Sequence, residues 1–173
     1  MSDPDHQPDA GRPRPVPTVL DVLRKRIDHD TFDAAIFSLE AVAADLGYGD
    51  VRSLPGSIAW IDRLRSESKR IGVLASGERV AAALELAGIA DRFDVVVTGS
   101  HLEQLVAGAL DQLNVEADRA VVVGVEPSAL EAARAAGVVL AIGVARGNCS
   151  PEQLRRAGAD AVVADLQELL GPI

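Results

Sequence analysis

The sequence contains a single cysteine, Cys149, which excludes an internal disulfide. It has no apolar run of the roughly eighteen residues that a membrane-spanning helix needs, and no basic segment followed by an apolar one opens the chain, so we expect a cytoplasmic protein with no membrane contact. Lysine is also rare, with only Lys25 and Lys69, and the formal net charge is −9. This charge argues against a nucleic-acid partner, because affinity for a phosphate backbone comes from clustered Lys and Arg.

The 173 residues, 48% of them apolar, are enough for one domain with a substantial core. The first seventeen residues hold five of the nine prolines and three aspartates, a composition that predicts a disordered tail. Residues 18–30 carry apolar side chains at helical spacing, among them Leu20, Leu23 and Ile27, and predict an amphipathic helix. Its apolar stripe either closes an edge of the same domain or contacts another protein. The core domain then spans residues 31–173.

After this helix, short apolar runs alternate with helical patterns. Apolar runs of this kind are buried on both faces, which predicts a doubly wound parallel sheet in a three-layer α/β/α domain. The expected strands are Ala34–Phe37, Ile71–Leu74, Asp94–Val97, Ala120–Val123, Val138–Ile142 and Ala161–Val163. The expected helices are Gly56–Ser68, Glu78–Ala87, His101–Leu113, Pro127–Ala136, Pro151–Ala157 and Asp165–Leu170.

Ligands of such sheets bind at the carboxyl ends of the strands, so the residue after each strand matters most. The first strand leads into FDAAIFSLEAVAAD, residues 32–45. This segment resembles the first signature of the haloacid dehalogenase (HAD) phosphohydrolase superfamily, an apolar strand followed by Asp-x-Asp-Gly. In that family the first Asp is the nucleophile and the second is the general acid/base, but here these positions hold Ser38 and Glu40, so the resemblance implies that the catalytic residues are lost. A serine without an adjacent base is a poor nucleophile, and it brings no negative charge to a metal ion.

The second strand leads into IGVLASGERVAAALELAGIADRFDVVVTG, residues 71–99, which is similar to the β-phosphoglucomutase-like branch of the same family. The phosphate-binding Ser/Thr of that motif matches Ala75, which has no hydroxyl. Ser76 and Gly77 still precede a helix, whose N-terminus can hold an anion, although Glu78 places a negative charge there. The alternative is that Ser76 only caps this helix.

The third and fourth strand ends also depart from the family pattern. The family's lysine-bearing loop is missing after Thr98; Lys69 precedes a strand, at the opposite edge of the sheet, and we expect His101 to be a solvated or capping residue. The family's metal-binding carboxylates match Gly124 and Val125. Glu126 follows one position later, where we expect it to interact with a helix dipole rather than with a metal. The sequence therefore predicts that the magnesium site is lost and that no cofactor is bound.

The resemblance extends over residues 32–170, but residues 45–54 leave no room for the helical cap that normally shields the active site. The chain is also similar to the N-terminal, non-catalytic HAD-like domain of actinobacterial trehalose phosphate phosphatases, which is likewise capless. This likeness rests on the Val-Val-Val strand, the Ala-Ala-Arg helix and the Leu-Arg-Arg-x-Gly-Ala-Asp segment.

These substitutions predict a catalytically inactive HAD-like protein that acts through protein contact, as a scaffold or regulatory subunit or as a homo-oligomer, with a possible link to sugar-phosphate or trehalose metabolism. Phosphoryl transfer in this family needs a carboxylate nucleophile, a metal, a cation and a hydrogen-bonding Ser/Thr, and each of the four is absent at its matched position. Two alternatives stay open. One is a small phosphate-ligand sensor that uses Ser76 and Gly77, and the other is a hydrolase with weak activity that depends on Glu40 or Glu126.

Overall fold

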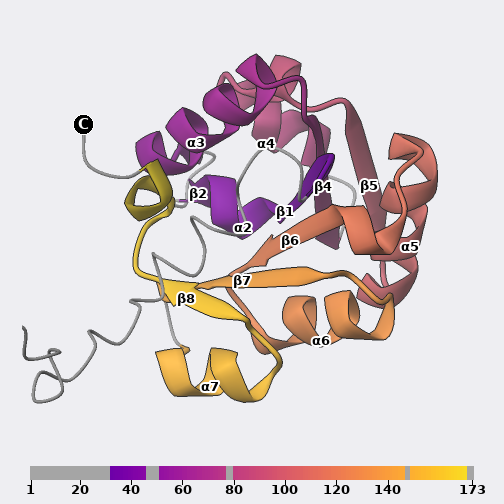
Figure 1. Ribbon diagram of the computed structural model, residues 1–173. Coiled ribbons are helices and arrows are strands. Elements are labelled where there is room, and N and C mark those ends of the chain that lie inside the picture. Colours follow the sequence, from indigo (N-terminus) through magenta and orange to yellow (C-terminus); the bar gives the residue numbers. More distant parts are fainter. Residues whose placement is uncertain (1–31, 46–50, 77–79, 147–148, 171–173) are drawn as a thin grey trace, which may run out of the picture.

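A computed structural model describes residues 32–45, 51–76, 80–146 and 149–170 of the chain (Figure 1). Its centre is a six-stranded sheet with the strand order β5-β4-β1-β6-β7-β8, in which all five neighbouring pairs are parallel. The predicted doubly wound parallel sheet is therefore confirmed. The strands are β1 (Ala34–Ser38), β4 (Arg70–Ser76), β5 (Val95–Gly99), β6 (Ala120–Gly124), β7 (Leu140–Val144) and β8 (Ala161–Val163).

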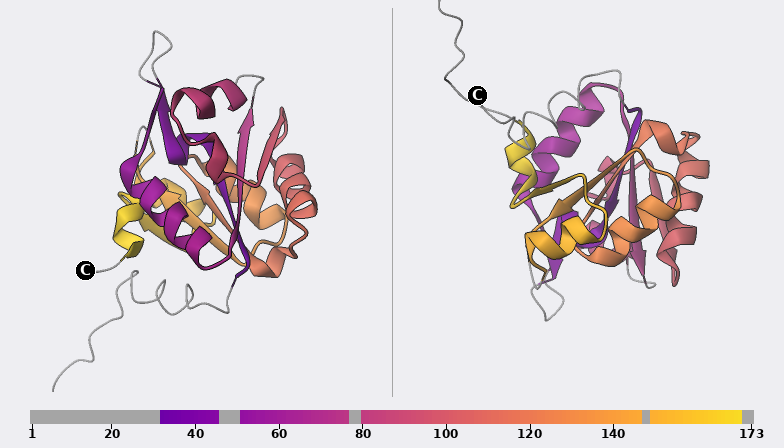
Figure 2. Two further views of the ribbon diagram at one scale, coloured as in Figure 1. Left: turned by 90° about the horizontal axis from the view of Figure 1, so that it is seen from above. Right: turned by 60° about the horizontal axis from the view of Figure 1, so that its bottom comes forward.

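Helices cover both faces of this sheet, as the views in Figures 1 and 2 show. One face carries α3 (Pro55–Ser66), α4 (Val80–Leu86) and a 3-10 helix, η3 (Leu166–Leu170). The other face carries α5 (Leu102–Leu113), α6 (Pro127–Ala135) and α7 (Pro151–Arg156). Short 3-10 turns, η1 (Ala90–Arg92) and η2 (Ala117–Arg119), lead into β5 and β6.

The side chains of β1 alternate between two hydrophobic cores, one on each face of the sheet. Ala35 and Phe37 belong to the core under α3, where the Phe37 ring meets the Trp60 ring edge-on at 5.7 Å. Ala34 and Ile36 belong to the core under α5 and α6. Because both faces of β1 are buried, its sequence is apolar from Ala34 to Phe37 and does not alternate with polar residues, as expected for a central parallel strand.

The predicted start of β7 at Val138 is wrong by two residues, because Val138 closes the preceding helix. Gly137 has a φ of +80°, and its N–H donates to the Arg134 carbonyl while the N–H of Val138 donates to the Ala133 carbonyl. This pattern of hydrogen bonds ends α6 in a Schellman motif, which favours glycine at the left-handed position. The strand therefore begins only at Leu140.

A short helix and a hairpin at the carboxyl end of β1 were not predicted. Helix α2 (Leu39–Val42) follows β1 directly, and β2 (Ala43–Asp45) pairs antiparallel with β3 (Val51–Ser53). In the described residues between β1 and α3 this hairpin stands where a helical cap would be inserted. The described residues between β1 and α3 therefore form a short hairpin and not a helical cap.

Some predictions fall outside the described residues. They are the tail (1–17), the amphipathic helix (18–30) with Leu20, Leu23 and Ile27, and the helix start at Gly77 and Glu78. The division of the chain into these parts stays a prediction. No helix among the described residues is both long and apolar enough to span a membrane.

Candidate functional site at the carboxyl edge of the sheet

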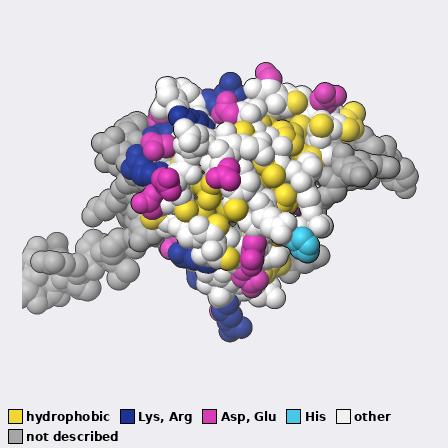
Figure 3. Space-filling model, turned by 90° about the vertical axis from the view of Figure 1, so that its right-hand side faces the viewer, with side chains coloured by type: hydrophobic (Ala, Val, Ile, Leu, Met, Phe, Trp, Pro, Cys, Tyr) yellow, Lys and Arg dark blue, Asp and Glu magenta, His cyan; other side chains and the backbone are white. Residues whose placement is uncertain are grey.

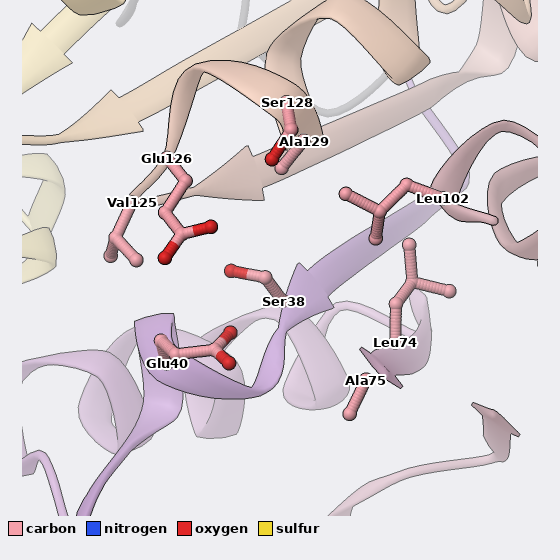
Figure 4. Close-up of a pocket in the computed structure, with 9 residues that line it drawn as sticks. All are labelled: Ser38, Glu40, Leu74, Ala75, Leu102, Val125, Glu126, Ser128 and Ala129. Carbon is pink, nitrogen blue, oxygen red and sulfur yellow. The ribbon is translucent and has the colours of Figure 1, made fainter. Parts of the chain in front are cut away.

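A small cavity of about 40 Å³ lies at the carboxyl edge of the sheet (Figure 4). The ends of β1, β4 and β6 and the first turns of α5 and α6 surround it, which is where a ligand of a doubly wound sheet binds. The predicted positions Ser38, Glu40, Ala75 and Val125 line it together. The remaining lining residues are Leu74, Leu102, Glu126, Ser128 and Ala129.

Ser38, at the position matched to the family's nucleophile, is the last residue of β1 and is only 7% exposed. Its Oγ is buried and has no hydrogen-bond partner. A serine becomes a nucleophile when a neighbouring base accepts its proton, and such a base would lie within hydrogen-bonding distance of Oγ. The Ser38 hydroxyl is therefore not activated in this arrangement.

Two carboxylates face the same cavity. Glu40 lies in the first turn of α2, and Glu126 is the N-cap residue of α6, although its side chain makes no capping hydrogen bond. Figure 4 shows both carboxylates turned toward the Ser38 hydroxyl. The structure brings them together because β1 and β6 are neighbours in the sheet.

At Gly124, matched to a metal-binding carboxylate of the family, there is no space for a side chain. An added Cβ would lie 2.7 Å from the Cβ of Ala129 in α6, closer than carbon atoms pack. Val125, at the neighbouring matched position, is 8% exposed and belongs to the hydrophobic core. Among the described residues, no three His, Cys, Asp or Glu side chains are grouped closely enough to hold a metal ion. This donor set does not fit the family's magnesium ion, which needs several oxygen ligands.

The predicted anion site after β4 is only partly described. Ala75 is 5% exposed and brings a methyl group to the cavity wall. Ser76 ends β4, pairing in register with Gly99 of β5, while Gly77 lies outside the described residues. The glutamates of the cavity would repel a phosphate at the described part of this edge.

Lys69 lies at the opposite edge of the sheet, as its place before β4 predicted. Its Nζ donates a hydrogen bond of 2.7 Å to the carbonyl oxygen of Phe32, just before β1 begins, and lies 5.3 Å from the centre of the Phe32 ring. Since β1 and β4 run parallel, this places the ammonium group a full strand length from the cavity.

The sequence reasoning missed Arg146, which follows β7 at the carboxyl edge. Its Nη1 donates a 3.3 Å hydrogen bond to the main-chain carbonyl of Glu40, although its side chain does not line the cavity. Considering the end of β7 as well as those of the first four strands would have found it. His101, expected to be a solvated or capping residue, is the exposed N-cap residue of α5, and its side chain makes no capping hydrogen bond.

Comparisons with known proteins agree on one family of hydrolases. Residues 19–142 match the sequence model of the haloacid dehalogenase-like hydrolases. The chain is 51% identical over 63 residues to a trehalose-phosphate phosphatase of Mycobacterium avium and 30% identical over 149 residues to that of Mycobacterium leprae. These matches cover 36% and 83% of this chain but 16% and 33% of the two relatives, so the chain spans only a part of their length.

A plasmid-encoded phosphoglycolate phosphatase of Cupriavidus necator is 30% identical over 168 residues, which cover 92% of this chain and 71% of that protein. Among solved structures, the β-phosphoglucomutase of Clostridium difficile has a TM-score of 0.67 at 16% identity and covers 80% of this chain and 93% of its own. A hydrolase from Deinococcus radiodurans, with bound phosphate and sodium, has a TM-score of 0.70 at 18% identity, covering 80% and 93%. At these identities the structures support the fold alone.

Proposed function

The chain belongs to the haloacid dehalogenase-like hydrolase family, and we propose that it has lost the phosphoryl-transfer chemistry of that family and acts through protein contact. The observation that carries the proposal is the state of Ser38. A neutral hydroxyl with no hydrogen-bond partner stands where the reaction needs an anionic nucleophile.

The rest of the cavity supports the same proposal. Catalysis of phosphoryl transfer relies on positive charge that stabilises the transferred group. The cavity instead has two carboxylates, Glu40 and Glu126, and Lys69 is bonded to Phe32 at the other edge of the sheet. Restoring a carboxylate at Gly124 would require α6 to move. The proposal therefore includes the loss of the magnesium site and of any cofactor.

The names of the relatives suggest the setting of this contact. Two of them are trehalose-phosphate phosphatases and one is a phosphoglycolate phosphatase. We place the protein as a scaffold or regulatory subunit linked to sugar-phosphate or trehalose metabolism. A partner in this setting would be a metabolic enzyme or a second copy of the chain.

The contact surface we propose is the apolar stripe of residues 18–30, with Leu20, Leu23 and Ile27. Size-exclusion chromatography with light scattering tests it on the chain of residues 1–173, alone and after incubation with cell lysate. Replacing the three residues by glutamate should abolish any dimer or complex. Leu86→Glu is the matched control, because Leu86 is 62% exposed on α4 and should tolerate the charge. A chain that is monomeric and partnerless before substitution would contradict the proposal, as would a complex that survives it.

A second candidate is a weak hydrolase, favoured by the meeting of Ser38, Glu40 and Glu126 in one cavity. One of the two glutamates would act as a general base in this function. An assay with an aryl phosphate and magnesium separates the two functions. If the chain is inactive, as we propose, its turnover should not exceed that of the Glu40→Gln and Glu126→Gln variants. Turnover that both variants lose would replace it with this second function.

A further inference from the structure

We propose that the cavity lined by Ser38, Glu40 and Glu126 binds a primary ammonium group, supplied by a lysine side chain of a partner protein. The inference rests on the proposed function for the source of the lysine, but the binding site itself is defined by the residues of this chain. It gives the former catalytic position a role in recognition.

The first support is the number of acceptors that converge. The Ser38 Oγ is buried, lines the cavity and has no hydrogen-bond partner, so it has an unused acceptor site. The carboxylates of Glu40 and Glu126 face the same space (Figure 4). An alkylammonium group has three N–H donors and no acceptor. Three acceptors around one cavity therefore match its donors in number.

The second support is size and the nature of the walls. A volume of about 40 Å³ accommodates a group the size of a water molecule, which needs roughly 10–15 Å³. An ammonium group is about as large as a water molecule and therefore fits this cavity. Leu74, Ala75 and Val125 give apolar walls along which methylene groups can pack. A lysine has such a stem, and burying it beside the charged head is its usual behaviour.

The third support is charge. No Lys or Arg is among the residues that line the cavity. Arg146, which follows β7, donates to the main-chain carbonyl of Glu40 and not to its carboxylate. Two carboxylates near a neutral hydroxyl favour a cation over a phosphate. A divalent metal ion is less suited, because apolar side chains form most of the remaining lining and supply no oxygen ligands.

Titration of the ¹⁵N-labelled full-length chain with n-butylammonium chloride, followed by NMR, tests this site. We expect saturable shifts at the amides of Ser38, Glu40 and Glu126. Glu40→Gln and Glu126→Gln should each raise the dissociation constant about threefold to fivefold, as expected for pairs with exposed carboxylates. Ser38→Ala should also weaken binding. Glu85→Gln is the matched control, since Glu85 is exposed on α4 away from the cavity.

Three further ligands decide what is recognised. n-Butanol has the stem without the charge, and tetramethylammonium has the charge without N–H donors, so neither should bind. If tetramethylammonium bound as tightly as n-butylammonium, binding would depend only on the negative charge of the surface and not on N–H donors, and the proposal would be overturned. Magnesium that displaces n-butylammonium at lower concentration would make the site a metal site and also overturn it.

The source of the ammonium group is tested with Nα-acetyl-lysine methylamide and its Nζ-acetylated form. The free ammonium form should bind and the acetylated form should not; equal binding of both would refute a lysine ligand. If the lysine amide does not bind, the oligomer experiment on Leu20, Leu23 and Ile27 is unaffected. If the chain has no partner but binds n-butylammonium, the proposed function and a lysine donor are both contradicted, whereas the ammonium site is retained. The two failures are therefore distinguishable.

Discussion

Ser57 donates a hydrogen bond from its Oγ to the carbonyl oxygen of Ala41 at 2.6 Å, and both residues are buried. The bond ties the first turn of α3 to α2, the helix that carries Glu40 into the cavity. Ser38, the other buried serine of the described residues, makes no hydrogen bond with its hydroxyl. The two serines are buried to a similar degree, but only the Ser57 hydroxyl makes a hydrogen bond, and this difference determines what each hydroxyl contributes to stability.

Alanine substitutions should therefore act in opposite directions. Ser57→Ala removes a buried hydrogen bond and leaves the Ala41 carbonyl unpaired, which should lower the free energy of unfolding by about 1–3 kcal/mol. Ser38→Ala removes a buried hydroxyl that is already unpaired, so the free energy of unfolding should stay the same or rise by up to about 1 kcal/mol. Urea denaturation measures both, with the exposed Ser66→Ala as a control. If Ser38→Ala is as destabilising as Ser57→Ala, the Ser38 hydroxyl has a partner in solution.

Gly124→Ala should destabilise the fold by about 1–3 kcal/mol, because an added Cβ would overlap Ala129 and push α6 away from the sheet. Gly108→Ala is the matched control. Its added Cβ would lie 3.8 Å from Val97, an ordinary contact, and alanine is the better helix former in α5 by about 0.5–1 kcal/mol. Thermal denaturation should therefore show opposite shifts. A neutral Gly124→Ala would mean that a carboxylate could return to this position without rearrangement.

Lys69→Met should lower the free energy of unfolding by about 1–2 kcal/mol, since it removes a charged hydrogen bond to Phe32 and a contact with its ring. The same variant should bind n-butylammonium normally, because Lys69 lies at the opposite edge of the sheet from Ser38. Arg155→Met, in an exposed part of α7, is the control for loss of a cation. Weaker ligand binding in Lys69→Met, at unchanged stability, would contradict the position of this lysine at the edge of the sheet opposite the cavity.

The sequence was sufficient for the order along the chain of the six strands of the main sheet, because apolar runs and helical patterns are local signals. The strand at Ala161–Val163 was predicted residue for residue. The hairpin of β2 and β3 was not, since strands of three residues carry too few side chains for a period to emerge. The start of β7 was misplaced because the hydrogen bond that takes Val138 into the end of α6 depends on the left-handed Gly137, not on apolar character.

The sequence identified residues that line the candidate site, but not the arrangement in which they meet. Ala75, Gly124 and Val125 could be matched one by one to family positions, because each follows a strand. That Glu40 and Glu126 share a cavity depends on the pairing of β1 with β6, which are more than eighty residues apart in the chain. The missing partner of Ser38 depends on every side chain around it. Neither of these properties is encoded in a local pattern.

The ion pair of Asp33 and Arg119 should make stability depend on pH. Arg119 donates from Nε to Asp33 Oδ2 at 3.0 Å and from Nη2 to Oδ1 at 2.9 Å. These hydrogen bonds hold the pKa of Asp33 below its usual value of 3.8, against a smaller opposing effect of burial. Because the folded-state pKa is the lower one, the stabilisation is complete above the unfolded-state pKa and is lost as the pH falls through the folded-state pKa.

Asp33→Asn isolates this contribution. The variant should be less stable than the parent by no more than about 1 kcal/mol at neutral pH, since the pair is 52% and 39% exposed. The difference should stay constant down to about pH 5 and shrink below about pH 4, where the parent takes up the proton that the variant cannot bind. Salt at 0.5 M should reduce it further at neutral pH. Urea denaturation from pH 7 to pH 3 measures the difference, and a gap that widens on acidification would mean that Asp33 is protonated more readily in the folded chain.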